Sequence, residues 1–229
     1  MEIRSVGVLG AGQMGLGIAQ AAARAGYETI MVKATPGPLD AQRGKIEKQL
    51  QKDVERGKLT AADHGALLER LRWSTHLHDL AGVDLVIESI VEELAVKCDH
   101  FGRLDDVVKD DAIFATNTST LTVGELAAGT RRPERFLGLH FFNPVHAMKL
   151  VEVAPGLRTT PDTIDTCIAF AKKLGKAPVV VADSTGYIVN RLLVPYLMDA
   201  IRAYEEGVGS IADIDASMKL GCGYPMGPF

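Results

Sequence analysis

The sequence has few of the features that stabilise secreted proteins or anchor membrane proteins. Its three cysteines include no Cys-x-x-Cys pair, which argues against a disulfide framework or a cysteine zinc site. No run of about 18 apolar residues occurs and the N-terminus has no secretion-signal pattern, so no membrane partner is predicted. The net charge of −4 provides no general attraction to nucleic acid. We therefore expect a cytoplasmic protein without a nucleic-acid partner.

A metal site is not expected either. His76 and His78 would share one face of a strand, but no third ligand accompanies them.

Apolar, β-rich segments alternate with segments of helical periodicity along the first 185 residues. Several of these segments are continuously apolar, as is typical of parallel strands covered on both faces. This alternation predicts an α/β fold with a doubly wound parallel sheet. Residues 38–72 have helical periodicity and are predicted to form a helical excursion from that domain. The strands are expected at residues 3–9, 29–32, 84–90, 112–116, 136–142 and 178–182, with helices at 14–24 and 92–108.

From residue 186 onward the strand pattern stops. A long apolar helix is expected over residues 187–206, followed by a second helix over 211–220. Residues 186–229 are therefore predicted to begin an all-helical C-terminal domain. Because the sequence ends in a Gly/Pro-rich turn, we expect this domain to be incomplete.

A glycine-rich turn follows the first predicted strand and opens the first helix. Gly10, Gly12 and Gly15 form a Gly-x-Gly-x-x-Gly pattern, with Gln13 and Met14 between the last two glycines. In Rossmann-type domains such a turn brings backbone N–H groups at a helix N-terminus to the pyrophosphate of a dinucleotide. The sequence therefore predicts a Rossmann-type domain over residues 1–185 that binds a nicotinamide dinucleotide.

The second predicted strand ends at Lys33, where a Rossmann domain usually has an acidic residue that binds the adenosine ribose. One interpretation is that NADP is accepted as well as NAD. The alternative is a solvated lysine beside an NAD that is held mainly by its pyrophosphate.

Two polar residues interrupt apolar segments later in the chain. His140 lies at the end of one apolar strand and Glu152 lies in the next. A buried glutamate is costly unless it is paired, and a histidine is a natural partner for it. The pair predicts a general-base dyad, although a lone histidine on an apolar strand is more often structural.

Five motifs, in order and spacing, resemble those of the L-3-hydroxyacyl-CoA dehydrogenases, including the 3-hydroxybutyryl-CoA type. They are GAGQMGLGIAQ, NTSTL, HFFNP followed by MKLVEV, TGYIVNRLL, and MKLGCGYPMGPF. The resemblance spans nearly the whole chain. It implies NAD-dependent interconversion of 3-hydroxyacyl-CoA and 3-ketoacyl-CoA, with His140 as the general base and Glu152 stabilising its imidazolium form.

The same resemblance implies roles for further residues. Ser119 would bind the substrate oxygen and Asn190 the thioester; otherwise they would be a helix cap and an interhelical hydrogen bond. Cofactor contacts are implied for Glu92, Lys97, Asn117 and Asn143. Lys97 would also touch the acyl-CoA, and both Glu92 and Lys97 would equally suit a surface helix.

The helical excursion carries a basic stripe. Lys45, Lys48, Lys52 and Arg56 share one helical face, while Ile46, Leu50 and Val54 mark an apolar one. By the resemblance, Lys48 and Arg56 would contact the phosphates of the acyl-CoA substrate; a solvated face is the alternative.

The resemblance also implies a homodimer, provided that the C-terminal domain is complete. Two other functions stay open: a related hydroxy-acid or sugar-acid dehydrogenase, and a catalytically silent structural relative.

Overall fold

The central strands of the first domain are buried on both faces, as their continuously apolar sequences require. In the computed structural model, which describes residues 1–229, β1 (Ser5–Leu9) and β4 (Leu85–Glu88) are adjacent inner strands of one eight-stranded sheet. The strand order is β3-β2-β1-β4-β5-β6-β7-β8. All neighbours are parallel except β6 and β7, which are antiparallel. The other strands are β2 (Glu28–Val32), β3 (Leu71–Ser74), β5 (Ile113–Thr116), β6 (Phe136–Phe141), β7 (Leu150–Pro155) and β8 (Ala177–Val180).

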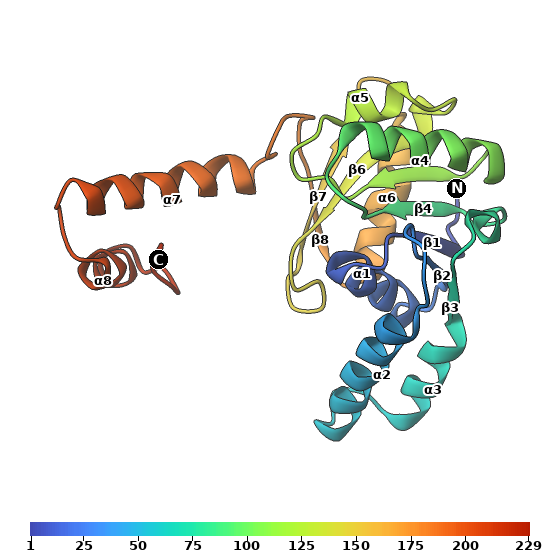
Figure 1. The fold of residues 1–229 in the computed structure, drawn as a ribbon, viewed down its shortest axis with the longest axis horizontal. Helices are drawn as coiled ribbons and strands as arrows, with labels where there is room; N and C mark the ends of the chain where they lie inside the picture. The colour runs from blue at the N-terminus through green and yellow to red at the C-terminus, as the bar shows by residue number, and fades with distance from the viewer. The chain divides into compact units, whose positions relative to one another are not determined.

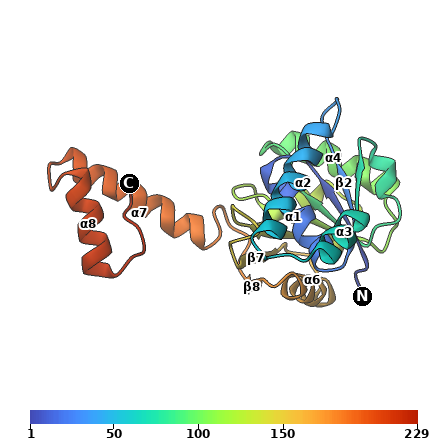
Figure 2. The ribbon, with the colours of Figure 1, turned by 90° about the horizontal axis from the view of Figure 1, so that it is seen from below.

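Helices cover both faces of this sheet, which confirms the predicted doubly wound fold (Figures 1 and 2). One face packs in a single apolar cluster against α1 (Gln13–Arg24), α6 (Pro161–Lys173), and the pair α2 (Asp40–Glu55) and α3 (Ala61–Arg70). The other face packs against α4 (Leu94–Val107) and α5 (Val123–Ala128), where Phe101 of α4 stacks edge-on against Phe136 of β6 with ring centroids 4.7 Å apart. Short 3-10 helices occur at η1 (Leu77–Leu80) and η2 (Pro133–Arg135).

The helical excursion and the segment directly after it differ from their predictions in three details. Residues 71–74 form an edge strand beside β2 rather than the end of a helix. The strand was missed because it is four residues long and carries the exposed Arg72. His78 lies in a 3-10 helix, so His76 and His78 do not share a strand face. On α2 the buried stripe continues from Leu50 to Asp53, which lies 3.7 Å from Arg24, whereas Val54 is half-buried.

Residues Thr185–Phe229 form a second compact unit, separate from Met1–Ser184. It contains α7 (Val189–Glu205) and α8 (Ile211–Cys222). Ser210 caps α8 by accepting a hydrogen bond from the amide of Asp213. Many apolar side chains of this unit are exposed, with Leu192 at 68%. No helix in the chain is both long and apolar enough to cross a membrane.

Candidate active site

The glycine-rich turn after β1 is shaped by close backbone approaches. Gly10 has a positive φ of 114°, and a Cβ there would lie 2.3 Å from the carbonyl oxygen of Ser89. A Cβ on Gly15 would lie 1.8 Å from the carbonyl oxygen of Gly10. Gly12 faces open space, and no side chain caps the helix that begins after it. The N-terminal amides of α1 therefore point toward a space that an anion can approach.

This turn forms one wall of a cleft of about 650 Å³ at the carboxyl ends of the strands. A cleft of this size is typical of cofactor sites. The fit to a dinucleotide is supported by a buried acceptor, because Oε1 of Gln42 lines the cleft and has no hydrogen-bond partner. The predicted residues that line the cleft are Gly10, Gly12, Gln13, Met14, Lys33, Glu92, Lys97, Asn117 and Ser119.

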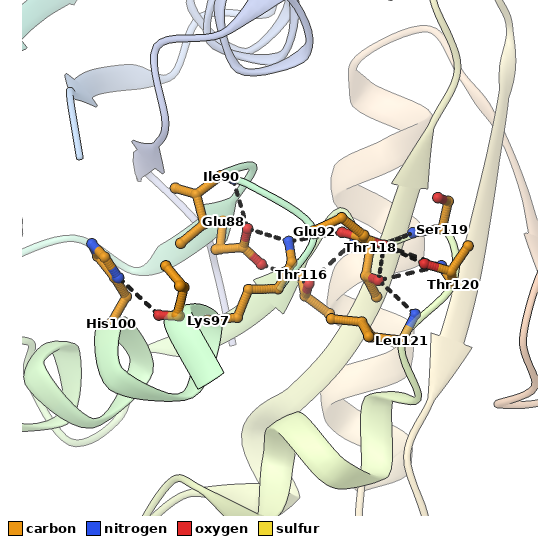
Figure 3. A network of polar contacts seen from close by, with 11 residues as sticks. Glu88, Ile90, Glu92, Lys97, His100, Thr116, Thr118, Ser119, Thr120 and Leu121 are labelled. Carbon is orange, nitrogen blue, oxygen red and sulfur yellow. Dashed lines mark hydrogen bonds and ion pairs between the residues drawn. The ribbon is translucent and has the colours of Figure 1, made fainter. Parts of the chain in front are cut away.

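An ion triad lies beneath this cleft, with a buried lysine, one buried carboxylate and one exposed carboxylate. Nζ of Lys97 lies 2.6 Å from Oε1 of Glu88 and 3.1 Å from Oε2 of Glu92. Lys97 is 1% exposed and Glu88 is fully buried. Glu88 also accepts hydrogen bonds from the amide of Ile90 and the hydroxyl of Thr116, each at 2.7 Å. The ammonium predicted to contact cofactor and acyl-CoA is thus shared between two carboxylates (Figure 3).

Glu92 holds the turn that contains Ser119. Its Oε1 accepts hydrogen bonds from the Thr118 hydroxyl, from the Ser119 amide at 2.9 Å, and from the amide and hydroxyl of Thr120 (Figure 3). Burial opposes ionisation of Glu92, but the Thr118 hydrogen bond and the charge of Lys97 outweigh it and lower the pKa of Glu92 to about 2. Glu92 is therefore an anion at neutral pH, and it fixes the backbone around Ser119.

Asn117 connects this turn to the next strand. Its backbone N–H donates to the carbonyl oxygen of Glu88, and its side-chain Oδ1 accepts a hydrogen bond of 2.8 Å from the backbone N–H of Phe141 in β6. The turn after β5 is consequently held against the strand that carries His140.

His140 and Glu152 lie directly opposite each other in the antiparallel pair β6 and β7. Nδ1 of His140 is 2.8 Å from Oε2 of Glu152, and both side chains are buried. Because an ionised carboxylate only accepts hydrogen bonds, Nδ1 carries the proton of this contact. The ring of Phe142 lies 4.4 Å from the imidazole. The geometry is that of a histidine whose tautomer and orientation are set by a carboxylate.

Side-chain alternation places these polar groups on one face of the sheet. The neighbours of His140 in its own strand, Leu139 and Phe141, belong to the apolar cluster on the opposite face. By the same alternation Glu88, Thr116 and Glu152 share the face of His140, toward α4 and α5.

The other predicted residues are distributed more widely. Nε2 of Gln13 donates to Oδ1 of Asn143 at 3.0 Å, which joins the glycine-rich turn to the loop after β6. Lys48 is exposed on α2, and Arg56 is exposed directly after the last residue of that helix. Asn190 lies at the start of α7, in the second unit.

A family model described as the NAD-binding domain of 3-hydroxyacyl-CoA dehydrogenase matches residues 5–184, and the model of the C-terminal domain of that enzyme matches residues 186–229. The chain belongs to the 3-hydroxyacyl-CoA dehydrogenase family. It is an NAD-dependent oxidoreductase of that family, as the first of these domains indicates.

Similar proteins agree with this family assignment. The chain is 42% identical over 221 residues to the 3-hydroxybutyryl-CoA dehydrogenase of Clostridioides difficile, a match that covers 96% of this chain and 79% of that one. It is 47% identical over 233 residues to human mitochondrial hydroxyacyl-coenzyme A dehydrogenase, covering 99% and 74%. The crystal structure of the (S)-3-hydroxybutyryl-CoA dehydrogenase of Ralstonia eutropha superposes with a TM-score of 0.96 at 41% identity, covering 99% and 80%.

Sequence reasoning missed Glu88 and Thr116 in this 3-hydroxyacyl-CoA dehydrogenase. A signal was present for Glu88, since it ends a continuously apolar strand just as Glu152 interrupts one. The partner that makes its burial possible, Lys97, lies on the helix that follows and could not be assigned from spacing alone.

Proposed function

We propose that this chain interconverts L-3-hydroxyacyl-CoA and 3-ketoacyl-CoA, with His140 as the general base and Glu152 as its partner. The observation that carries the proposal is the 2.8 Å contact between Nδ1 of His140 and Oε2 of Glu152 on a buried sheet face. In the oxidative direction we assign the reaction to fatty acid β-oxidation.

The cofactor is proposed to lie along the cleft after β1. Backbone amides of the turn from Gly10 to Gly15 would bind the pyrophosphate, and Gln13 and Asn143, which bond to each other, would border the nicotinamide end. When bound, NAD supplies the acceptor for the hydride that leaves the 3-carbon of the substrate.

Proton transfer is proposed to occur at Nε2 of His140, because Nδ1 faces the carboxylate. Nε2 takes the proton of the 3-hydroxyl, and the negative charge of Glu152 stabilises the imidazolium that results. In the reductive direction the same atom returns the proton to the 3-keto oxygen.

Ser119 is proposed to donate a hydrogen bond to the substrate oxygen. Its backbone is held by Glu92, so its hydroxyl is offered from a fixed turn rather than from a mobile loop. We propose that Lys97 acts indirectly, by neutralising Glu88 and holding Glu92, while its stem borders the cleft.

Two assignments toward the acyl-CoA follow from the family resemblance, and the first of them is also supported by exposure of the side chains. Lys48 is proposed to contact the CoA phosphates from the exposed face of α2, and Arg56 from directly after that helix. Asn190 is proposed to bind the thioester, and this role is supported by the resemblance alone.

The second unit is proposed to pack against a second copy of the chain. Along α7 the side chains of Leu192, Val194 and Met198 are exposed by 68%, 53% and 45%, an apolar surface that water disfavours. Sedimentation equilibrium is expected to report a dimer. A monomer that stays stable and soluble at high concentration would contradict this part of the proposal.

The catalytic proposal is tested by reduction of acetoacetyl-CoA with NADH, comparing the wild type with His140→Gln. Loss of a general base is expected to lower kcat by about 10²–10⁴-fold. NADH binding, followed by fluorescence, is expected to be unchanged. Full activity of His140→Gln would refute the mechanism, and activity on free hydroxy acids without activity on acetoacetyl-CoA would refute the substrate class.

A further inference from the structure

The adenosine end of the cofactor cleft lacks the carboxylate that usually binds the ribose hydroxyls. In Rossmann domains that carboxylate follows the second strand, but here β2 ends at Val32 and Lys33 follows. The cleft is lined at this end by Lys33, Ala34, Thr35 and Gln42. Glu92 also lines the cleft, but its carboxylate is bound to Lys97 and to the Ser119 turn.

The ammonium of Lys33 is held in place by the loop that follows β2. Nζ donates to the carbonyl oxygens of Pro36 at 3.2 Å and Pro38 at 3.1 Å. Gly37, with a φ of 107°, lets the loop close around this ammonium, because a Cβ there would lie 3.3 Å from Nζ. Two of the three ammonium protons are used by these carbonyls, so one remains to donate to a ligand.

Gln42, on the first turn of α2, lines the same cleft as Lys33 and offers a neutral acceptor. Its Oε1 is buried and without a donor, a costly state that a ligand hydroxyl would relieve. Unlike a carboxylate, an amide oxygen accepts from a ribose hydroxyl without repelling a phosphate on the neighbouring carbon.

From this arrangement we infer that Lys33 determines cofactor specificity, that Gln42 binds the ribose of either cofactor, and that the chain binds NADP(H) as well as NAD(H). Lys33 donates to the 2′-phosphate of NADP, and Gln42 accepts from a ribose hydroxyl that both cofactors carry. Two experiments test this inference, one of ligand binding and one of kinetics. Only the kinetic experiment rests on the proposed function, because the binding experiment needs no catalysis.

The binding experiment is a calorimetric titration of the full chain with 2′,5′-ADP and with 5′-AMP. A hydrogen bond to a charged group, at the weak end of its usual range, predicts that 2′,5′-ADP binds about 10-fold more tightly. Lys33→Asp is expected to abolish the difference in affinity between the two ligands. Lys33→Gln keeps a donor for the loop carbonyls and is expected only to reduce that difference. Lys172→Asp, the same charge change on the exposed end of α6, is the matched control and is expected to leave it intact.

The kinetic experiment compares NADPH with NADH in the reduction of acetoacetyl-CoA. We expect the two kcat/KM values to agree within about tenfold, and Lys33→Asp to shift their ratio toward NADH by about 100-fold or more. Equal affinity for 2′,5′-ADP and 5′-AMP, together with a large preference for NADH in the wild type, would overturn the inference and leave the proposed function intact. Tight 2′,5′-ADP binding without activity on acetoacetyl-CoA would support the inference and count against the proposed function.

Discussion

Replacement of Lys97 by methionine is the most informative perturbation of the site, because it separates stability from catalysis. The substitution keeps an unbranched apolar stem but removes the ammonium that lies 2.6 Å from Glu88 and 3.1 Å from Glu92. Glu88 is then left fully buried with only the hydrogen bonds from Ile90 and Thr116 to offset its charge.

The magnitude follows from the burial of the pair. Removing one partner of a buried ion pair costs about 3–5 kcal/mol, because the other charge is left uncompensated. For a chain of this length each kcal/mol lowers Tm by about 2–4 °C, so Lys97→Met is expected to lower Tm by about 6–20 °C. Calorimetry at neutral pH measures this shift directly.

A double variant tests whether the cost arises from the orphaned charge. Lys97→Met combined with Glu88→Leu removes both charges, and we expect it to be less destabilised than Lys97→Met alone. In the folded single variant kcat is also expected to fall, because Glu92 loses a partner that holds it on the Ser119 turn. A loss below about 1 kcal/mol in Lys97→Met would refute the assignment of a buried ion pair between Lys97 and Glu88.

Three further predictions concern the dyad, the basic stripe and acid stability. Glu152→Gln keeps the side-chain shape but removes the charge that stabilises the imidazolium. Stopped-flow kinetics should therefore give a kcat lower by about 10²–10⁴-fold, with KM for NADH nearly unchanged. An unchanged kcat would exclude the dyad. Lys48→Ala combined with Arg56→Ala is expected to raise KM for acetoacetyl-CoA severalfold without changing KM for NADH, and an unchanged acyl-CoA KM would show a solvated face. Because the pKa of Glu92 is lowered from 4.5 to about 2, its stabilising contribution is present above pH of about 4.5 and is lost as the pH falls to about 2. Thr118→Val removes one donor to this carboxylate, so its melting curves should lose less stability over that pH range than those of the wild type.

The fold could be predicted from the sequence because its signals are local. The glycine turn at residues 10–15 follows a strand and opens a helix, and continuously apolar strands identify a sheet covered on both faces. The edge strand Leu71–Ser74 was missed because its signal is not local: its pairing with β2 depends on a distant segment and not on its own residue pattern.

The site could be predicted only in part. The contact of His140 with Glu152 was expected, because each interrupts an apolar strand, and its catalytic role stays a prediction. Lys97 was expected to contact the cofactor and the acyl-CoA. Its ion pair with Glu88 was not expected, because residue spacing on a helix does not show which carboxylate of a neighbouring strand is buried against it. Burial of charge is a tertiary property, so the burial of Glu88 and Lys97 could be identified only from the folded structure.

The antiparallel pairing of β6 and β7 has a consequence for how this enzyme can change. Only twelve positions separate His140 from Glu152, so the acid–base unit is carried by one local hairpin. Three strands lie between β6 and β2, which places the segment after β2 roughly 19 Å away across the sheet. If the proposed roles hold, substitutions at Lys33 are therefore expected to change the preferred cofactor without altering the proposed proton-transfer hairpin, so that the two properties can evolve separately.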